Sequence, residues 1–163
     1  MSRDSIETER LRGAQRAFAP VEAWDEKAKK GFRTAAEQAP FMIRTLGLGS
    51  GIAALAAKEG ERQELAAILA RWLLRDCAYS PCRSPDARPD QTPAWETQLR
   101  NASAPLPRGK LEEAVKREWI KRLLAEIAAG NRAQYRAAQI EALGYAGWIK
   151  RLAQAFCPKP GSG

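Results

Sequence analysis

The longest helical pattern in the chain lies in residues 131–156, which read NRAQYRAAQIEALGYAGWIKRLAQAF. Asn131 and Gln134 have the spacing of a capping box, so we expect the helix to begin there. Along it, apolar residues recur every three or four positions and predict a buried face. Ile140 and Leu143 lie on the other side, which predicts a helix that is buried in its middle, at the centre of a helical bundle.

The rest of the chain is also dominated by helix-forming residues, with two valines and no alternation of apolar and polar residues that would predict a strand. We expect Pro20 to kink or restart the first helix, Pro40 to interrupt the second and Gly60 to end the third. These patterns predict an all-α fold, a single-domain helical bundle of about six helices over residues 1–158, with a flexible tail at 159–163. The helices before residue 131 are expected at about 4–32, 34–46, 52–57, 62–77 and 110–129.

Residues 80–109 interrupt the helical pattern. They hold six of the ten prolines, and because proline lacks a backbone donor and clashes inside a helix, the segment cannot be one continuous helix. We expect an extended surface loop within the domain. Thr92-Pro93 has the signature of a short helix start, since proline suits the first helical position. Trp95 lies in this segment, whereas the other four tryptophans fall on or beside apolar stripes and are expected in the core.

Composition excludes several kinds of active site. The 163 residues include no histidine, which rules out a Ser-His-Asp or Cys-His catalytic system and the common zinc enzymes. Cys77, Cys82 and Cys157 are too few for a disulfide scaffold, and three reduced thiols are favoured over a Cys77–Cys82 bridge. We therefore expect no enzyme activity, no metal and no cofactor. The start does not resemble a secretory signal and no apolar run is long enough to span a membrane, so a cytoplasmic protein is expected.

The glycine-rich run from Gly47 to Gly51 and the paired carboxylates are weaker candidates for a site. Glycines at a helix start expose backbone N–H groups to phosphate, but this run lacks the preceding strand and the Gly-Lys-Ser/Thr ending of nucleotide-binding loops. A tight turn between closely packed helices is the favoured interpretation. Carboxylate pairs such as Glu112-Glu113 lie beside basic residues on faces expected to be exposed, so an acid/base site is not favoured.

Positive charge is the strongest functional signal. The net charge is +8, and residues 110–163 carry ten basic and five acidic side chains, which gives this third +5. A helix face of long cations binds nucleic acid by neutralising phosphates and releasing counterions. An ordinary solvated face, with Glu113–Arg117 as a local pair, is the competing interpretation. The candidate nucleic-acid contacts are Lys110, Arg117 and Lys121 on one helix face, Arg132 and Arg136 at the start of the last helix, and Lys150 and Arg151 near its end.

Two segments resemble a known family. The stretch APFMIRTLGLGSGIA at 39–53, with YRAAQIEAL at 135–143 and WIKRLA at 148–153, resembles the small subunit of the type III-B CRISPR effector, the Cmr complex. The resemblance implies a non-enzymatic subunit, several copies of which stack beside the backbone subunits of an RNA-guided ribonucleoprotein in antiviral defence. It implies that the partners are the other Cmr subunits, copies of this chain, guide RNA and target RNA, that no membrane is involved, and that the cutting residues belong to other subunits.

Two other functions remain as alternatives. A helix-turn-helix DNA-binding regulator would use the turn at 47–51, but the helix that follows is rich in alanine and leucine and lacks the side chains that read base edges. A purely protein-binding helical adaptor would use its positive charge for solubility. The salt dependence of nucleic-acid binding distinguishes the three.

Overall fold

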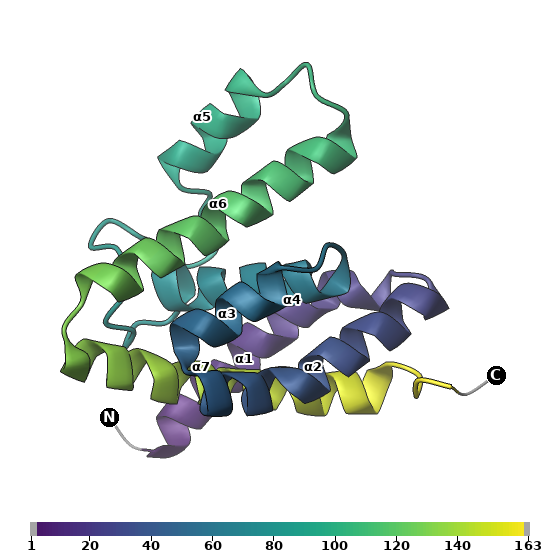
Figure 1. Cartoon of the computed structure of the whole chain (residues 1–163), viewed down its shortest axis with the longest axis horizontal. Helices are drawn as coiled ribbons and strands as arrows, with labels where there is room; N and C mark the ends of the chain where they lie inside the picture. The colour runs from purple at the N-terminus through teal and green to yellow at the C-terminus, as the bar shows by residue number, and fades with distance from the viewer. Residues whose placement is uncertain (1–2, 162–163) are drawn as a thin grey trace.

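The computed structural model describes residues 3–161, a chain of helices joined by turns and loops (Figure 1). Within these residues there are seven α-helices, one π-helical turn and no strand, which confirms the expected all-α bundle. The elements are α1 (Arg3–Glu22), α2 (Glu26–Leu46), α3 (Leu48–Ala56), α4 (Glu61–Arg71), the π-helical turn η1 (Trp72–Asp76), α5 (Ala94–Ala102), α6 (Arg108–Ala129) and α7 (Arg132–Phe156).

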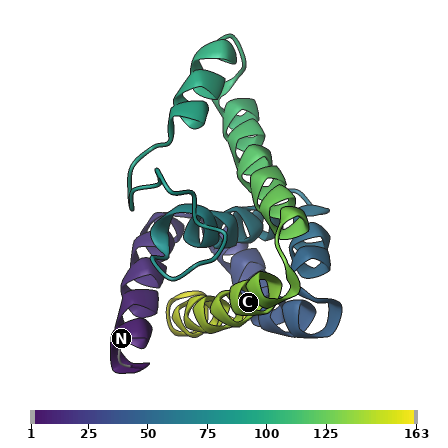
Figure 2. The same ribbon diagram turned by 90° about the vertical axis from the view of Figure 1, so that its left-hand side faces the viewer.

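The helices form a bundle from which one hairpin projects. α7 packs against α1 and α2, and α4 packs against α2, α3 and α6. α5 packs on α6, and these two helices extend away from the others (Figures 1 and 2). The long α6 therefore belongs to the bundle in its C-terminal half and to the projecting hairpin in its N-terminal half.

α7 begins where the sequence predicted. The Gln134 backbone N–H donates to the Asn131 side chain at 2.9 Å, and the Asn131 backbone N–H donates to Gln134 Oε1 at 2.9 Å, which is the expected capping box. The helix contacts α1, α2, α3, α4 and η1, as a central helix should. Ile140 is the exception to the predicted burial, because its side chain is 66% exposed. α7 is thus buried along one side and open to solvent along the other.

Aromatic side chains join three elements in the core. Tyr145 of α7 stacks on Trp72 of η1, with ring centroids 4.3 Å apart and planes 3° apart. The Tyr145 hydroxyl donates a hydrogen bond to the Gly13 carbonyl of α1 at 3.2 Å. Glycine is required at position 13, because a Cβ there would lie 2.2 Å from the Trp72 ring. Close packing therefore fixes α1, η1 and α7 relative to one another.

A buried carboxylate links the same three elements. Glu141 is 6% exposed and accepts hydrogen bonds from Arg10 Nε at 3.0 Å, from Arg10 Nη2 at 2.8 Å and from Trp72 Nε1 at 3.1 Å. These contacts with Glu141 raise the pKa of Arg10. A Cβ at Gly144 would lie 2.5 Å from Arg10 Cζ, so glycine at this position makes room for the guanidinium.

The first helical pattern is divided shortly after Pro20, where a kink or a restart was expected. α1 ends at Glu22, the chain leaves the helical conformation at 23–25, and α2 begins at Glu26. Asp25 is the physical reason, because its carboxylate accepts a hydrogen bond from the Ala28 backbone N–H at 2.8 Å and caps α2. Pro20 lies two residues before the end of α1, whereas Pro40 lies inside α2 and does not interrupt it, contrary to the expectation.

Two glycines with positive φ form the sharp turns around α3. Gly47, with φ +86°, separates α2 from α3, and Gly60, with φ +87°, directly precedes α4. Gly60 was expected to end α3, but it lies at the start of α4 instead. The tight turn that the sequence favoured is Gly47 alone, since the rest of the glycine-rich run begins α3, and a Cβ at Gly51 would lie 3.0 Å from Ile43 Cα, so α2 and α3 are closely packed there.

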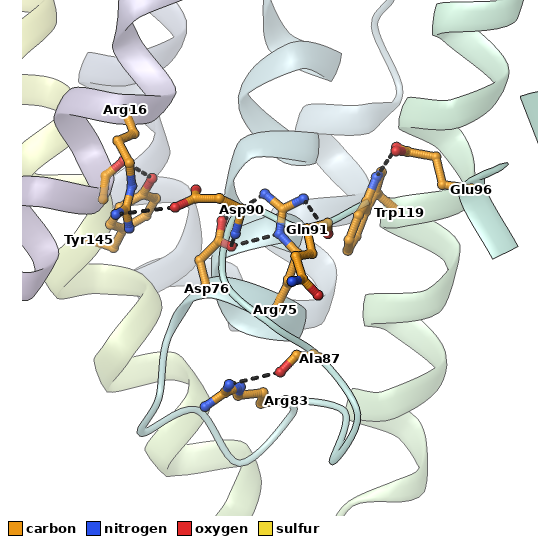
Figure 3. Close-up of polar contacts among 11 residues, drawn as sticks. Arg16, Arg75, Asp76, Arg83, Ala87, Asp90, Gln91, Glu96, Trp119 and Tyr145 are labelled. Carbon is orange, nitrogen blue, oxygen red and sulfur yellow. Dashed lines mark hydrogen bonds and ion pairs between the residues drawn. The ribbon is translucent and has the colours of Figure 1, made fainter. Parts of the chain in front are cut away.

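The proline-rich segment 80–109 is not one extended loop. It contains α5, which begins directly after Pro93 as the sequence indicated. The residues before it, 77–93, form a series of turns and are called the strap below. Polar contacts hold the strap in place, and among them Arg75 Nη1 donates to the Gln91 carbonyl at 3.3 Å (Figure 3).

Candidate nucleic-acid interface

Four of the seven predicted cations lie along one side of α7. An α-helix turns by about 100° per residue, so these four side chains fall within a sector of about 100° around the helix. The arginines among them are exposed and the lysine is half-buried. The exposed Ile140 lies in the same sector. The four cations are Arg132, Arg136, Lys150 and Arg151.

The two arginines at the start of α7 carry uncompensated charge. The side chains of Arg132 and Arg136 form no ion pair or hydrogen bond with any side chain described at 5–161, nor with the backbone there. Arg132 lies in the first turn of α7, where a cation also opposes the helix dipole at a cost of about 0.3–1 kcal/mol, and Arg136 follows in the second turn. Local helix energetics therefore do not explain why arginines occupy these two positions.

The two cations near the end of α7 lie beside other side chains. The Arg151 guanidinium is 4.8 Å from the centre of the Trp148 ring. Trp148 Nε1 donates to Glu7 at 2.8 Å, and this hydrogen bond is the main reason that the pKa of Glu7 is lowered. The helix rises about 21 Å between Arg136 and Lys150, because each of the intervening 14 steps adds about 1.5 Å. The sector therefore has two cationic ends.

The three predicted cations of α6 are exposed, and two of them have acidic neighbours. Arg117 Nη2 lies 3.2 Å from Glu59 Oε1 in the turn before α4, and not beside Glu113 as the sequence suggested. Lys121 Nζ lies 4.0 Å from Glu118, and its side chain is 77% exposed. Exposed ion pairs contribute about 0–1 kcal/mol and are screened by salt, so both cations are available to phosphate.

The structure distributes the seven cations over three places. α6 leads into α7 through the turn at 130–131, and the end of α6 and the start of α7 lie at one edge of the molecule (Figure 1). The start of α6 belongs to the projecting hairpin (Figure 2). Lys121, Arg132 and Arg136 thus lie toward the shared edge, Lys110 and Arg117 lie farther along α6 toward the hairpin, and Lys150 and Arg151 lie at the far end of α7.

The acidic pairs make structural contacts. Glu112 accepts hydrogen bonds from Arg100 at 2.7 Å and 3.4 Å, which lower the pKa of Glu112. Glu64 pairs with Lys116 and with Arg71. In the described part of the chain, no group of three or more Asp, Glu, Cys or His side chains is placed to hold a metal ion.

The three cysteines are free and buried, and no disulfide joins Cys77 to Cys82. Burial raises the pKa of Cys77 to about 12, and it also raises the pKa values of Cys82 and Cys157. A thiol that is held protonated is a poor nucleophile, so these side chains act as small apolar residues of the core.

Sequence reasoning missed a cavity of about 610 Å³ between the strap, α5 and α6. Trp95 and Trp119 form part of its lining, with ring centroids 4.9 Å apart. Arg122 lies 4.5 Å from the centre of the Trp95 ring, and Arg75 lies 5.4 Å from that of Trp119. Trp119 Nε1 donates to the buried Glu96 at 2.9 Å (Figure 3). The position of Trp95 outside any apolar stripe was the one signal of this site in the sequence.

A comparison with protein families covers the region that carries these features. The family model described as "CRISPR-associated protein (Cas_Cmr5)" matches residues 9–156. The chain belongs to the Cmr5 family. The resemblance seen in its sequence is thereby confirmed, and Cmr5 is a subunit of the type III-B CRISPR, or Cmr, complex. Among curated proteins and among solved structures, no significant match was found.

The match to Cmr5 extends from α1 to the end of α7. It therefore includes the cations of both helices and the cavity beneath the strap. This chain also exposes large apolar side chains on two neighbouring helices, Phe41 on α2 and Ile140 and Phe156 on α7. Among its described residues, no helix combines the length and the apolar character needed to cross a membrane.

Proposed function

We propose that this Cmr5 chain is a non-catalytic structural subunit that contacts guide and target RNA through basic helix faces, in a complex serving antiviral defence. The observation that carries the RNA contact is the pair Arg132 and Arg136, exposed and without an acidic partner at the start of α7. Because the helix dipole disfavours Arg132 in the first turn, and neither arginine has an acidic partner, an external anion is the simplest reason for both.

The mechanism is electrostatic. Each guanidinium or ammonium that meets a phosphate neutralises it and releases counterions, which lends affinity without sequence preference. Lys150 and Arg151 provide a second point of contact along the same side of α7, and Lys110, Arg117 and Lys121 provide contacts on α6. The paired carboxylates and buried thiols support a role without catalysis, in which the cutting residues belong to other subunits.

The partners are other Cmr subunits and copies of this chain, in the cytoplasm. Phe41, Ile140 and Phe156 are large apolar side chains in contact with solvent, and such residues typically become buried in protein interfaces. The α5–α6 hairpin offers a second surface that extends beyond the bundle (Figure 2). These features support stacking beside the backbone subunits.

Ile140 favours the adaptor as a second candidate, because this exposed apolar residue lies between the cationic ends of α7. In that case the same face of α7 binds protein and not RNA. The helix-turn-helix regulator gains no support, since α3 exposes serine and alanine side chains at Ser50 and Ala53 where base-reading residues would be required.

The test is target-RNA binding by a reconstituted Cmr complex over a range of salt concentrations. Each lost phosphate contact reduces the slope of log affinity against log salt by about 0.7 for single strands and about 0.9 for duplex. The double variant Arg132→Ala/Arg136→Ala is expected to reduce the slope by about 1.4–1.8. The matched control is Arg12→Ala/Arg16→Ala, which removes two exposed arginines at the same spacing that already have acidic partners.

Assembly is measured in the same preparations by pull-down of the tagged chain, with and without RNase. The arginine double variant is expected to recover the other Cmr subunits as the unaltered chain does. An unchanged salt slope in a correctly assembled complex would contradict RNA contact at α7. Loss of the other subunits would instead assign this face to protein binding and support the adaptor.

A further inference from the structure

The cavity beneath the strap has the shape and floor of a small-ligand site. Its volume of about 610 Å³ falls within the range of about 300–1,000 Å³ that is typical of ligand pockets. Trp95, Trp119 and Leu74 contribute to an apolar lining. Trp119 and Leu74 are buried, so the half-buried Trp95 provides the accessible aromatic surface of this lining. A flat apolar surface of this kind suits a planar ring.

The rim of the cavity carries a cation that is free to bind an anion. Arg75, Arg88 and Arg122 line the cavity together with the acids Asp86 and Glu126. Arg75 pairs with Asp76 at 2.6 Å, and Arg122 pairs with Glu118 at 3.1 Å. The Arg88 side chain is exposed and forms no ion pair or hydrogen bond with another described residue.

Neutral hydrogen-bonding side chains complete the lining. Ser84, Gln91 and Thr92 line the same cavity and are exposed. The contact that holds Gln91 uses its backbone carbonyl, so its side-chain amide retains donors and an acceptor for a ligand. The cavity therefore combines aromatic rings, a guanidinium without an acidic partner, and neutral groups that pair with polar ring edges.

We propose that this cavity binds one nucleotide, with the base against Trp95 and the phosphate at Arg88. Stacking on an aromatic side chain accepts any base, since every base has a π-face. An aliphatic side chain of a partner protein would use the tryptophans but would leave Arg88 and the three neutral groups without partners. The nucleotide is either free in solution or an unpaired residue of an RNA strand. The second source depends on the RNA contact proposed above, and the first does not.

The test uses the full chain labelled with ¹⁵N, because each of the five tryptophans gives one indole N–H signal. Adenosine and uridine monophosphates are titrated first. The signals of Trp95 and Trp119 are expected to shift and to saturate, while those of Trp24 and Trp148, outside the cavity, stay in place. Signals of Trp95 and Trp119 that do not move with either mononucleotide or with a single-stranded oligouridylate would overturn the proposal.

Variants separate the cavity from general electrostatics. Arg88→Ala is expected to weaken mononucleotide binding about tenfold, the loss typical of one charge-assisted hydrogen bond. Ala125→Trp, at an exposed position that lines the cavity, is expected to block binding by filling the space. Arg44→Ala is the matched control, because it removes an exposed arginine on α2, away from the cavity. Equal effects of Arg88→Ala and Arg44→Ala would contradict a specific site.

The source of the nucleotide is decided by an oligouridylate and an abasic oligonucleotide of the same length. An unpaired base in a strand is indicated if the first shifts the two indole signals and the abasic strand does not. A free nucleotide is indicated if only the mononucleotides shift them. Equal shifts with the abasic strand would mean that no base enters the cavity. None of these readouts depends on Arg132 and Arg136, so failure of the cavity and failure of the α7 contacts are distinguishable.

Discussion

Removing the buried carboxylate of Glu141 should cost this protein much of its stability. Glu141→Ala leaves the Arg10 guanidinium, whose side chain is 13% exposed, without its main partner, and it leaves Trp72 Nε1 without an acceptor. Breaking a buried ion pair by removing one partner costs about 3–5 kcal/mol, and an unsatisfied buried N–H costs about 1–3 kcal/mol. Arg10 keeps a second partner in Glu7, which lowers the first figure. We therefore expect a total loss of about 3–5 kcal/mol.

The loss in the free energy of unfolding is measured by urea unfolding, monitored by far-ultraviolet circular dichroism. In thermal unfolding, the melting temperature of a chain of this size should fall by about 6–20 °C, at about 2–4 °C per kcal/mol. Glu141→Gln keeps an acceptor for Trp72 and should lose less. Glu22→Ala, at an exposed position, is the control and should stay within about 0.5 kcal/mol of the unaltered chain. A loss below about 1 kcal/mol for Glu141→Ala would refute the reasoning, because it would mean that water replaces the carboxylate at no cost.

Three smaller predictions use other contacts of the same fold. Gly13→Ala places a Cβ against a core tryptophan and should cost about 1–3 kcal/mol in urea unfolding, whereas Gly109→Ala meets open space in α6 and should be neutral or stabilising by about 0.5–1 kcal/mol. The thiols should react with a disulfide reagent only after unfolding, because burial raises the pKa of Cys77 to about 12, and rapid labelling of the native protein would contradict this. The folded-state pKa of Glu112 lies below its ordinary value of 4.5, so the stability from its pair with Arg100 is present above that pH and is lost as the pH falls through the folded-state pKa. As the pH is lowered, the free energy of unfolding of Glu112→Gln should therefore fall less steeply than that of the unaltered chain.

Features that depend on local sequence could be predicted, and features that depend on tertiary contacts could not. The capping box at Asn131 requires only residues three positions apart, and the apolar period of α7 is likewise local. A restart near Pro20 was expected, but the start of α2 at the cap formed by Asp25 was not. Ile140 fits a helical period but no neighbouring helix covers it sufficiently to bury it.

In the candidate site, too, local sequence predicted the exposed positions but not the tertiary contacts. The cations of α6 and α7 could be expected at the surface from their positions on each helix. Their partners depended on the fold, since Arg117 pairs with Glu59, which lies 58 positions away in the sequence. The cavity beneath the strap depends on three segments coming together, and six prolines in one of them favoured an extended loop instead.

Contact between α7 and RNA is tested most directly by ultraviolet crosslinking of the assembled Cmr complex, loaded with guide and target RNA, and by mass spectrometry of the crosslinked peptides. We expect crosslinked peptides at both cationic ends of α7, around Arg132 and Arg136 and around Lys150 and Arg151. Crosslinks on other subunits, with none on α7 in a complex that retains this chain, would contradict the proposed role.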